Sequence, residues 1–173
     1  TELTRLAADA EPFRSFVDPD DTAFLNPDDM PAALRNWCRD HGEPQPETEG
    51  QFIRCALESL ALKYRRVLGW LEALTGTPVE VVHVVGGGGR NELLNQFTAS
   101  ACGRPVIAGP VEATVLGNVL VQARTAGELG TLADIRRVVR ASCDLQRYEP
   151  ADATAWQEAF GRFEQLINSR HQT

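Results

Sequence analysis

The strongest pattern in the sequence is a long stripe of apolar residues at helical spacing. Seven residues follow one another at alternating intervals of four and three: Ile53, Leu57, Leu60, Tyr64, Val67, Leu71 and Leu74. This spacing predicts a helix that begins after a capping box at Thr48 and Gln51. We expect it to run to Thr75, because Gly76 and Pro78 are helix-ending residues. Additional apolar residues beside the stripe favour a core helix packed under a sheet over an intermolecular coiled coil.

The pattern changes downstream of this helix. Val79 to Val85 is rich in β-branched residues and predicts a strand, which ends at four consecutive glycines. Helical spacing resumes from Asn91 through Cys102. A second short strand, Pro105 to Ala108, precedes another helix over about Ala113 to Ala126. The order strand, helix, strand, helix predicts a parallel α/β unit with a right-handed crossover.

The remaining segments are predicted to be helical. The first fifty residues indicate short helices between acidic, proline-marked turns, with one helix from Met30 to Asp40. Leu132 to Arg140 and Ala153 to Asn168 are predicted as two closing helices. No repeat or linker divides the chain, so we expect a single domain. Its three parts are an acidic helical segment over 1–50, the α/β unit over 51–126 and C-terminal helices over 127–173.

Composition and charge narrow the classes of partner. The chain has 173 residues, 43% of them hydrophobic and 24% charged, which is typical of one globular domain. Its net charge is −7, and residues 1–50 alone hold 12 acidic and four basic residues. Such a surface does not favour nucleic acid, which requires clustered cations. No apolar run has bilayer length and no signal peptide is evident, so we expect a cytoplasmic protein without a membrane partner.

The chemistry-bearing side chains exclude several site types. None of the four cysteines forms a Cys-x-x-Cys pair, and Cys38 with His41 lacks the second ligand pair of a zinc site, so no metal ligand is assigned. Lys63 is the only lysine in the chain. This removes Schiff-base chemistry unless Lys63 itself is the nucleophile.

The glycine run, Gly86 to Gly89, is the main candidate for a ligand site. Glycines let the backbone approach a ligand, and the start of the next helix presents free amides to an anion, which predicts a nucleotide. The alternative is a tight turn where a helix packs closely on a sheet. Arg90 and Asn91 exclude a Walker A loop, which requires Gly-Lys-Ser/Thr. A dinucleotide site stays as an alternative, because Glu112 could bind a ribose although the third glycine is missing.

Longer segments resemble the C-terminal domain of the FGGY family of carbohydrate kinases. They are Val84 to Gln96, Ala101 to Gly103, Val106 to Thr114 and Leu116 to Asn118, with Phe24 to Met30 and Arg54 to Tyr64 upstream. The similarity extends over about residues 13–150. It implies an α/β lobe of the actin-like ATPase (ribonuclease H-like) fold, with ATP and Mg²⁺ as cofactors. Within the family, the segments around the loop are most similar to kinases of L-rhamnulose.

The resemblance also implies roles for individual residues. Gly87 matches the glycine that contacts ATP, and Asn91 matches a position that touches the base or ribose. Helix capping is the alternative for Asn91, and Gly86 and Gly88 are expected to shape the turn beside the nucleotide. We expect structural roles for four further residues of the motif, with Glu112 as a helix cap and Gly117 allowing close packing: Glu112, Thr114, Gly117 and Asn118.

Two side-chain pairs complete the site predictions. Cys38 and Cys55 match a cysteine pair that is disulfide-bonded in some members of the family, and two free buried thiols are the alternative in a reducing compartment. Arg54 and Glu58 are spaced as an i, i+4 ion pair, which we expect on an exposed face with a small contribution to stability.

The resemblance implies transfer of the γ-phosphate of ATP to the primary hydroxyl of L-rhamnulose, giving L-rhamnulose 1-phosphate in rhamnose catabolism. The family's catalytic aspartate and most of its sugar contacts lie N-terminal to the matched segments. We therefore assign no catalytic residue, expect the catalytic aspartate upstream of Thr1, and expect an inactive fragment of a longer two-domain kinase that meets its sugar through the N-terminal part. The alternatives are a kinase for xylulose, fuculose or a similar sugar, or a non-catalytic nucleotide-binding domain.

Overall fold

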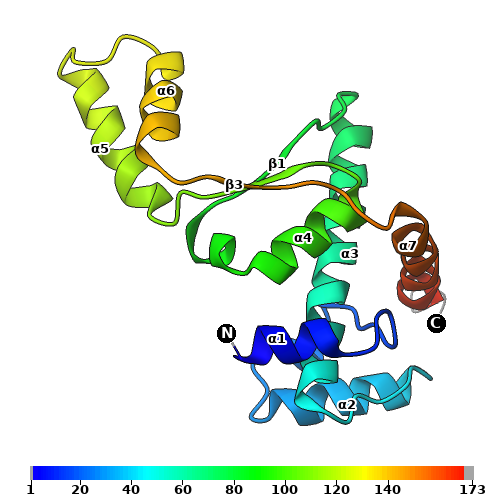
Figure 1. Cartoon of the computed structure of the whole chain (residues 1–173). Coiled ribbons are helices and arrows are strands. Elements are labelled where there is room, and N and C mark those ends of the chain that lie inside the picture. The colour runs from blue at the N-terminus through cyan, green and yellow to red at the C-terminus, as the bar shows by residue number, and fades with distance from the viewer. Residues whose placement is uncertain (1, 170–173) are drawn as a thin grey trace.

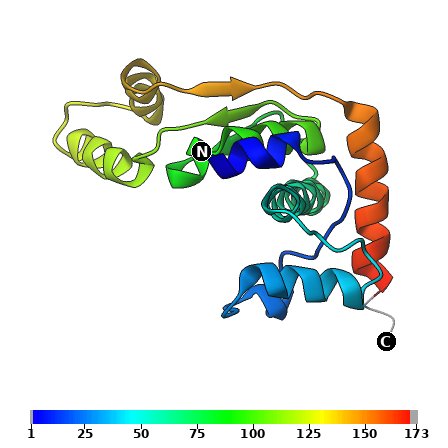
Figure 2. The ribbon, with the colours of Figure 1, turned by 60° about the horizontal axis from the view of Figure 1, so that its bottom comes forward.

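A 27-residue helix, α3 (Glu49–Thr75), organises the protein. The computed structural model describes residues 2–169. The other helices are α1 (Glu2–Asp9), α2 (Met30–Asp40), α4 (Glu92–Cys102), α5 (Ala113–Thr125), α6 (Leu132–Ser142) and α7 (Ala153–Asn168), with 3₁₀ turns η1 (Thr22–Phe24) and η2 (Gly86–Arg90). Viewed nearly along its axis, α3 lies between α2 on one side and α1 with α4 on the other, and α7 lies beside it with its own axis across the view (Figure 2).

The predicted helix boundaries agree closely with the structure because local capping chemistry sets them. Thr48 accepts a hydrogen bond from the backbone N–H of Gln51 and forms the predicted capping box at the start of α3. Gly76 ends α3 in the left-handed conformation at φ 65°. The boundaries predicted for α2 and α7 are confirmed to the residue.

Only the N-terminal part of the predicted stripe on α3 reaches the core. Leu57 is 8% exposed, whereas Leu71 and Leu74 are 49% and 84% exposed. The placement of α3 directly under a sheet is also corrected: α3 packs mainly on α4 and α1, and α4 is the helix that packs on the second strand. The distal turns of α3 therefore carry apolar side chains outside the core of the described chain.

Within residues 2–169, the sheet has three short strands in the order β1 (Val82–Val84), β2 (Val106–Ala108) and β3 (Gln146–Tyr148). β1 and β2 are parallel, as predicted, with Val84 opposite Ala108. β3 is antiparallel to β2 and was not predicted. Figure 1 shows the sheet between the α5–α6 pair at one end and α3 with α7 at the other.

The core consists of two adjoining clusters around the first half of α3. The larger cluster joins α3, α4 and α7 with the irregular segment before α2, through Phe16, Leu57, Leu62, Phe97, Trp156 and Phe163. The smaller cluster joins α2 to α3 through Val17, Leu34, Trp37, Cys38 and Cys55. Burial of these apolar side chains is the main stabilising contribution.

The Arg54–Glu58 pair is buried, which corrects its predicted exposure. The side chains are 12% and 1% exposed, and Arg54 Nε donates to Glu58 Oε1 over 2.7 Å. Arg54 Nη1 also donates to the carbonyl oxygens of Ala7, Ala8 and Ala10 at 2.9–3.1 Å. Arg54 thus caps the C-terminal end of α1 and holds that helix on α3.

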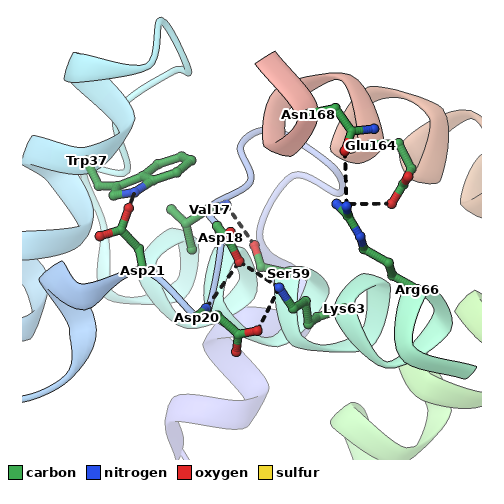
Figure 3. A network of polar contacts seen from close by, with 10 residues as sticks. All are labelled: Val17, Asp18, Asp20, Asp21, Trp37, Ser59, Lys63, Arg66, Glu164 and Asn168. Atoms are coloured by element: carbon green, nitrogen blue, oxygen red, sulfur yellow. Dashed lines mark hydrogen bonds and ion pairs between the residues drawn. The ribbon is translucent and has the colours of Figure 1, made fainter. Parts of the chain in front are cut away.

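Lys63 lies in a second polar network, drawn in Figure 3. Its Nζ atom lies 3.0 Å from Asp18 Oδ1 and 2.7 Å from Asp20 Oδ2. Burial by itself lowers the pKa of Lys63, but the two carboxylates outweigh burial and raise it above its ordinary value. A charged, paired ammonium does not favour the nucleophile role for Lys63. The same network ties the segment before α2 to α3 through Ser59, which accepts from Val17 N.

Candidate functional site at the glycine loop

The glycine loop leaves the carboxyl end of β1 as the 3₁₀ turn η2 and is joined to the loop that follows β2. Gly86 N donates to Pro110 O over 3.1 Å, and Gly109 N donates to Val84 O over 2.8 Å. Both loops therefore lie at the carboxyl ends of two neighbouring parallel strands. This edge of an α/β sheet is where ligands bind, so the structure brings the predicted glycines to a favourable place.

The four glycines have different surroundings. Gly86 has φ 76°, which favours glycine. A Cβ atom at Gly89 would lie 3.3 Å from Gly109 N, so this glycine permits close packing of the two loops. A Cβ atom at Gly88 would make an ordinary contact, whereas one at Gly87 would meet no atom within 4 Å. The tight-turn alternative thus accounts for Gly86 and Gly89, while Gly87 borders open space.

Asn91 begins α4 as its N-cap. Its Oδ1 atom accepts from Leu94 N over 3.1 Å, so the helix-capping alternative describes its side-chain oxygen. Within residues 2–169, its amide nitrogen makes no hydrogen bond. If Asn91 contacts the base or ribose, as the resemblance implies, its side-chain amide nitrogen is the group that donates. This role stays a prediction.

Asn95 is a residue of the loop region that the sequence reasoning missed. Its side chain is 1% exposed, and its Nδ2 atom donates to Gly89 O over 3.0 Å. Asn95 follows the N-cap by four residues, so it projects from the same face of α4 as Asn91. An amide four residues after the predicted start of the helix is the signal that could have identified it.

Two pockets lie near the loop. One pocket has a volume of about 510 Å³, and three basic side chains line it: His83, Arg136 and Arg140. The rest of its lining is Val85, Gly109, Pro110, Val139 and Leu145. A second pocket, of about 330 Å³, lies against Gly88 and Asn95. The first pocket combines apolar walls with guanidinium groups, a lining that suits an anionic ligand with an apolar part.

Two of the expected structural roles at the next helix require correction. Glu112 is the N-cap residue of α5, but its side chain makes no capping hydrogen bond. A Cβ atom at Gly117 would meet nothing within 4 Å in the described structure, so close helix packing does not account for this glycine. Asn118 accepts a hydrogen bond from Gln122 within α5.

Cys38 and Cys55 are both buried and present as free thiols. The thiols are in contact through a hydrogen bond, which lowers the pKa of Cys38 and raises that of Cys55. α2 and α3 therefore bring together the two cysteines that the resemblance pairs. The disulfide itself stays a prediction.

The described part of the chain has neither a cluster of metal ligands nor a membrane-spanning helix. Residues 2–169 contain no group of three or more His, Cys, Asp or Glu side chains placed to hold a metal ion. Over the same residues, no helix has the length and apolar character needed to cross a bilayer.

Comparison with known families decides the classification. Residues 1–126 match the model of the FGGY family of carbohydrate kinases, C-terminal domain. The chain belongs to this family. Its glycine loop, Gly109-Pro110 loop and both parallel strands all lie within the matched residues of this FGGY domain. The family match supports the nucleotide interpretation and leaves the dinucleotide alternative without support.

Curated relatives of this FGGY domain are rhamnulokinases. The rhamnulokinase of Bacteroides thetaiotaomicron is 51% identical over 166 residues, which cover 96% of this chain and 34% of the relative. The rhamnulokinase of Klebsiella pneumoniae is 46% identical over 137 residues, which cover 79% of this chain and 28% of the relative. The chain thus spans about a third of the length of the curated relatives it matches.

Solved structures of sugar kinases share the fold. Xylulose kinase from Rhodospirillum rubrum aligns over 99% of this chain and 34% of its own, with a TM-score of 0.68 and 20% identity. Plasmodium falciparum glycerol kinase with ADP aligns over 97% of this chain and 33% of its own, with a TM-score of 0.71 and 15% identity. The predicted actin-like α/β lobe is confirmed by these structures.

Proposed function

We propose that this FGGY domain is the nucleotide-binding part of an ATP-dependent sugar kinase that forms a single C-terminal lobe of a longer two-domain protein. The observation that carries the proposal is the joined pair of loops at the ends of β1 and β2, in which Gly87 alone of its neighbours borders open space. The nucleotide lies against the Gly87 backbone, beside Gly86 and Gly88. The amide nitrogen of Asn91 donates to the base or ribose.

The proposed reaction transfers the γ-phosphate of ATP to the primary hydroxyl of L-rhamnulose and yields L-rhamnulose 1-phosphate. The rhamnulokinase relatives support this acceptor, because they are 51% and 46% identical to the chain and match it over 96% and 79% of its length. The proposal places the protein in the cytoplasm, because that compartment supplies ATP. Within this reaction, the task of the described residues is to bind and orient the nucleotide.

The remaining chemistry is assigned to residues outside this chain. Phosphoryl transfer requires a base for the acceptor hydroxyl and donors around the phosphoryl group, and Mg²⁺ supplies charge neutralisation when bound. Mg²⁺ is coordinated by carboxylates, water and phosphate oxygens. Residues 2–169 contain no group of three or more His, Cys, Asp or Glu side chains placed to hold a metal ion, so Mg²⁺ would be held mainly by the phosphate oxygens of the nucleotide and by water. Because the base and most sugar contacts are assigned to the N-terminal part, we expect the isolated chain to be inactive.

A phosphorylation assay tests the proposed activity. The complete kinase that contains this chain, incubated with ATP, Mg²⁺ and L-rhamnulose, is expected to form L-rhamnulose 1-phosphate, and the 173-residue chain alone is expected to form none. D-Xylulose and L-fuculose serve as competing acceptors, with kcat/KM as the measure. A higher kcat/KM for either competitor contradicts the substrate assignment, and product formation by the chain alone contradicts the assignment of the base.

A further inference from the structure

Asn95 places a buried amide directly behind the glycine loop. The residue is 1% exposed, and its Nδ2 atom donates to the carbonyl oxygen of Gly89 over 3.0 Å. Its own backbone N–H donates to Asn91 O in the first turn of α4. The side chain thus connects a rigid helix to the last glycine of the loop.

Gly89 also packs against the ends of the two parallel strands. A Cβ atom at Gly89 would lie 3.3 Å from Gly109 N and 3.5 Å from Val84 O. Gly89 is therefore held between the strand ends and Asn95. A Cβ atom at Gly87, two residues earlier in the same 3₁₀ turn, would have no such neighbours, so this residue is connected to the strand ends and to Asn95 through the turn.

A buried amide at this position has a specific physical meaning. A polar group that is removed from water destabilises the fold unless it is hydrogen-bonded, so an apolar residue would satisfy burial more simply. Thr98 provides a comparison on the same helix. It is also 1% exposed, but its hydroxyl donates to Leu94 O within α4 and does not reach the loop.

We propose that Asn95 is a positioning residue for nucleotide binding. It holds the Gly89 carbonyl so that the Gly87 backbone is presented to the nucleotide. This inference rests on the proposed function of the loop. It goes beyond that function because it assigns the shape of the binding surface to a side chain that does not itself border the open space at Gly87.

The test compares four variants of the complete kinase that contains this chain. Asn95→Leu keeps the branching of the side chain in a larger group and removes the donor, and Asn95→Asp keeps the shape but turns a carboxylate oxygen toward Gly89 O. Thr98→Val is the matched control, since it removes a buried hydrogen bond that does not involve the loop. Gly87→Val blocks the proposed nucleotide surface directly.

Both Asn95 variants are expected to raise the KM for ATP and the Kd for ADP about 5–10-fold, the factor that corresponds to one lost hydrogen bond. The kcat at saturating ATP and the KM for the sugar are expected to stay within twofold of the unmodified enzyme. Thr98→Val is expected to lower the thermal midpoint about as much as the Asn95 variants do, because each removes one buried hydrogen bond. It is expected to leave the KM for ATP unchanged. This split between nucleotide affinity and stability separates positioning from a purely structural role.

Other outcomes overturn the inference in distinguishable ways. If Gly87→Val weakens nucleotide binding but both Asn95 variants bind ATP normally, the role of Asn95 is wrong and the proposed function stands. If Gly87→Val also leaves ATP binding unchanged, the proposed function fails and the inference with it. If both Asn95 variants are unfolded while Thr98→Val is folded, the amide maintains the fold and not the loop.

Discussion

Replacing Gly50 by alanine tests how α1 is held on α3. A Cβ atom at Gly50 would lie 2.4 Å from the carbonyl oxygen of Leu6 and 2.9 Å from its carbonyl carbon. Both atoms belong to the backbone of α1, so no side-chain rotation relieves the overlap. The helix has to move outward, which lengthens the hydrogen bonds from Arg54 to the carbonyls at the end of α1.

The expected magnitude follows from three contributions. Overpacking destabilises by about 1–3 kcal/mol, and weakening hydrogen bonds to a charged group adds about 1.5–3 kcal/mol. Alanine is better than glycine in a helix by up to about 1 kcal/mol, which offsets part of this. Gly50→Ala is therefore expected to lower the free energy of unfolding by about 1.5–5 kcal/mol. For a chain of this size, that corresponds to a thermal midpoint about 3–20 °C lower.

Gly69→Ala is the matched control on the same helix. A Cβ atom at Gly69 would meet no atom within 4 Å, so only the helix propensity changes. This variant is expected to raise the free energy of unfolding by about 0.5–1 kcal/mol. Thermal unfolding followed by circular dichroism should therefore shift in opposite directions for the two variants. If Gly50→Ala is as stable as Gly69→Ala, the close packing of α1 on α3 is wrong.

Three further outcomes test other parts of the structure. Lys63→Met leaves the carboxylate of Asp18, whose side chain is 12% exposed, without its cation. The free energy of unfolding, measured with urea, should fall by about 2–3 kcal/mol, and an unchanged urea midpoint would refute the buried pair. Burial raises the pKa of Glu58 above 4.5, although Arg54 partly offsets this, so the folded state binds the proton more tightly than the unfolded state. The stability of the unmodified chain relative to Glu58→Gln should therefore fall as pH rises from about 4.5 through the folded pKa, and a pH-independent difference would contradict it. Burial raises the pKa of Cys102 to about 11, which leaves about a hundredfold less thiolate at pH 8 than in a thiol of pKa 9.0. Alkylation by iodoacetamide at pH 8, followed by mass spectrometry, should therefore be about a hundredfold slower. Equal rates would show that the thiol is not buried.

The parts of the fold that sequence predicts well are those set by neighbours along the chain. Thr48 and Gln51 form their capping box within one turn, and Gly76 ends α3 through its own backbone conformation. The parallel pairing of β1 and β2 follows from the helix between them. β3 was missed because Gln146–Tyr148 is a short polar segment whose strand geometry comes from pairing with β2.

Burial was harder to predict than secondary structure. The Arg54–Glu58 spacing identifies an ion pair, but only the three-dimensional packing of α1 on α3 places it inside the protein. The partners of Lys63 lie more than forty residues away, at Asp18 and Asp20, and no local pattern indicates them. Long-range contacts of this kind depend on the path of the irregular segment before α2.

The candidate site was predictable as a loop but not as a surface. The glycine run and its resemblance to a family identified Gly86 to Gly89, yet the sequence does not distinguish a glycine that faces open space from one that packs against a strand. That distinction separates Gly87 from Gly89 and depends on the loop after β2. Asn95 was missed for the same reason, because its partner is a backbone carbonyl that the turn brings within reach.

Hydrogen–deuterium exchange on the complete kinase, with and without a non-hydrolysable ATP analogue, tests the central claim most directly. If the glycine loop is the nucleotide-binding surface of this FGGY domain, exchange slows in peptides that cover residues 85–91 and 109–112. Peptides from α7, at the other end of the sheet, should be unaffected. Saturating nucleotide that leaves exchange at 85–91 unchanged would contradict the account.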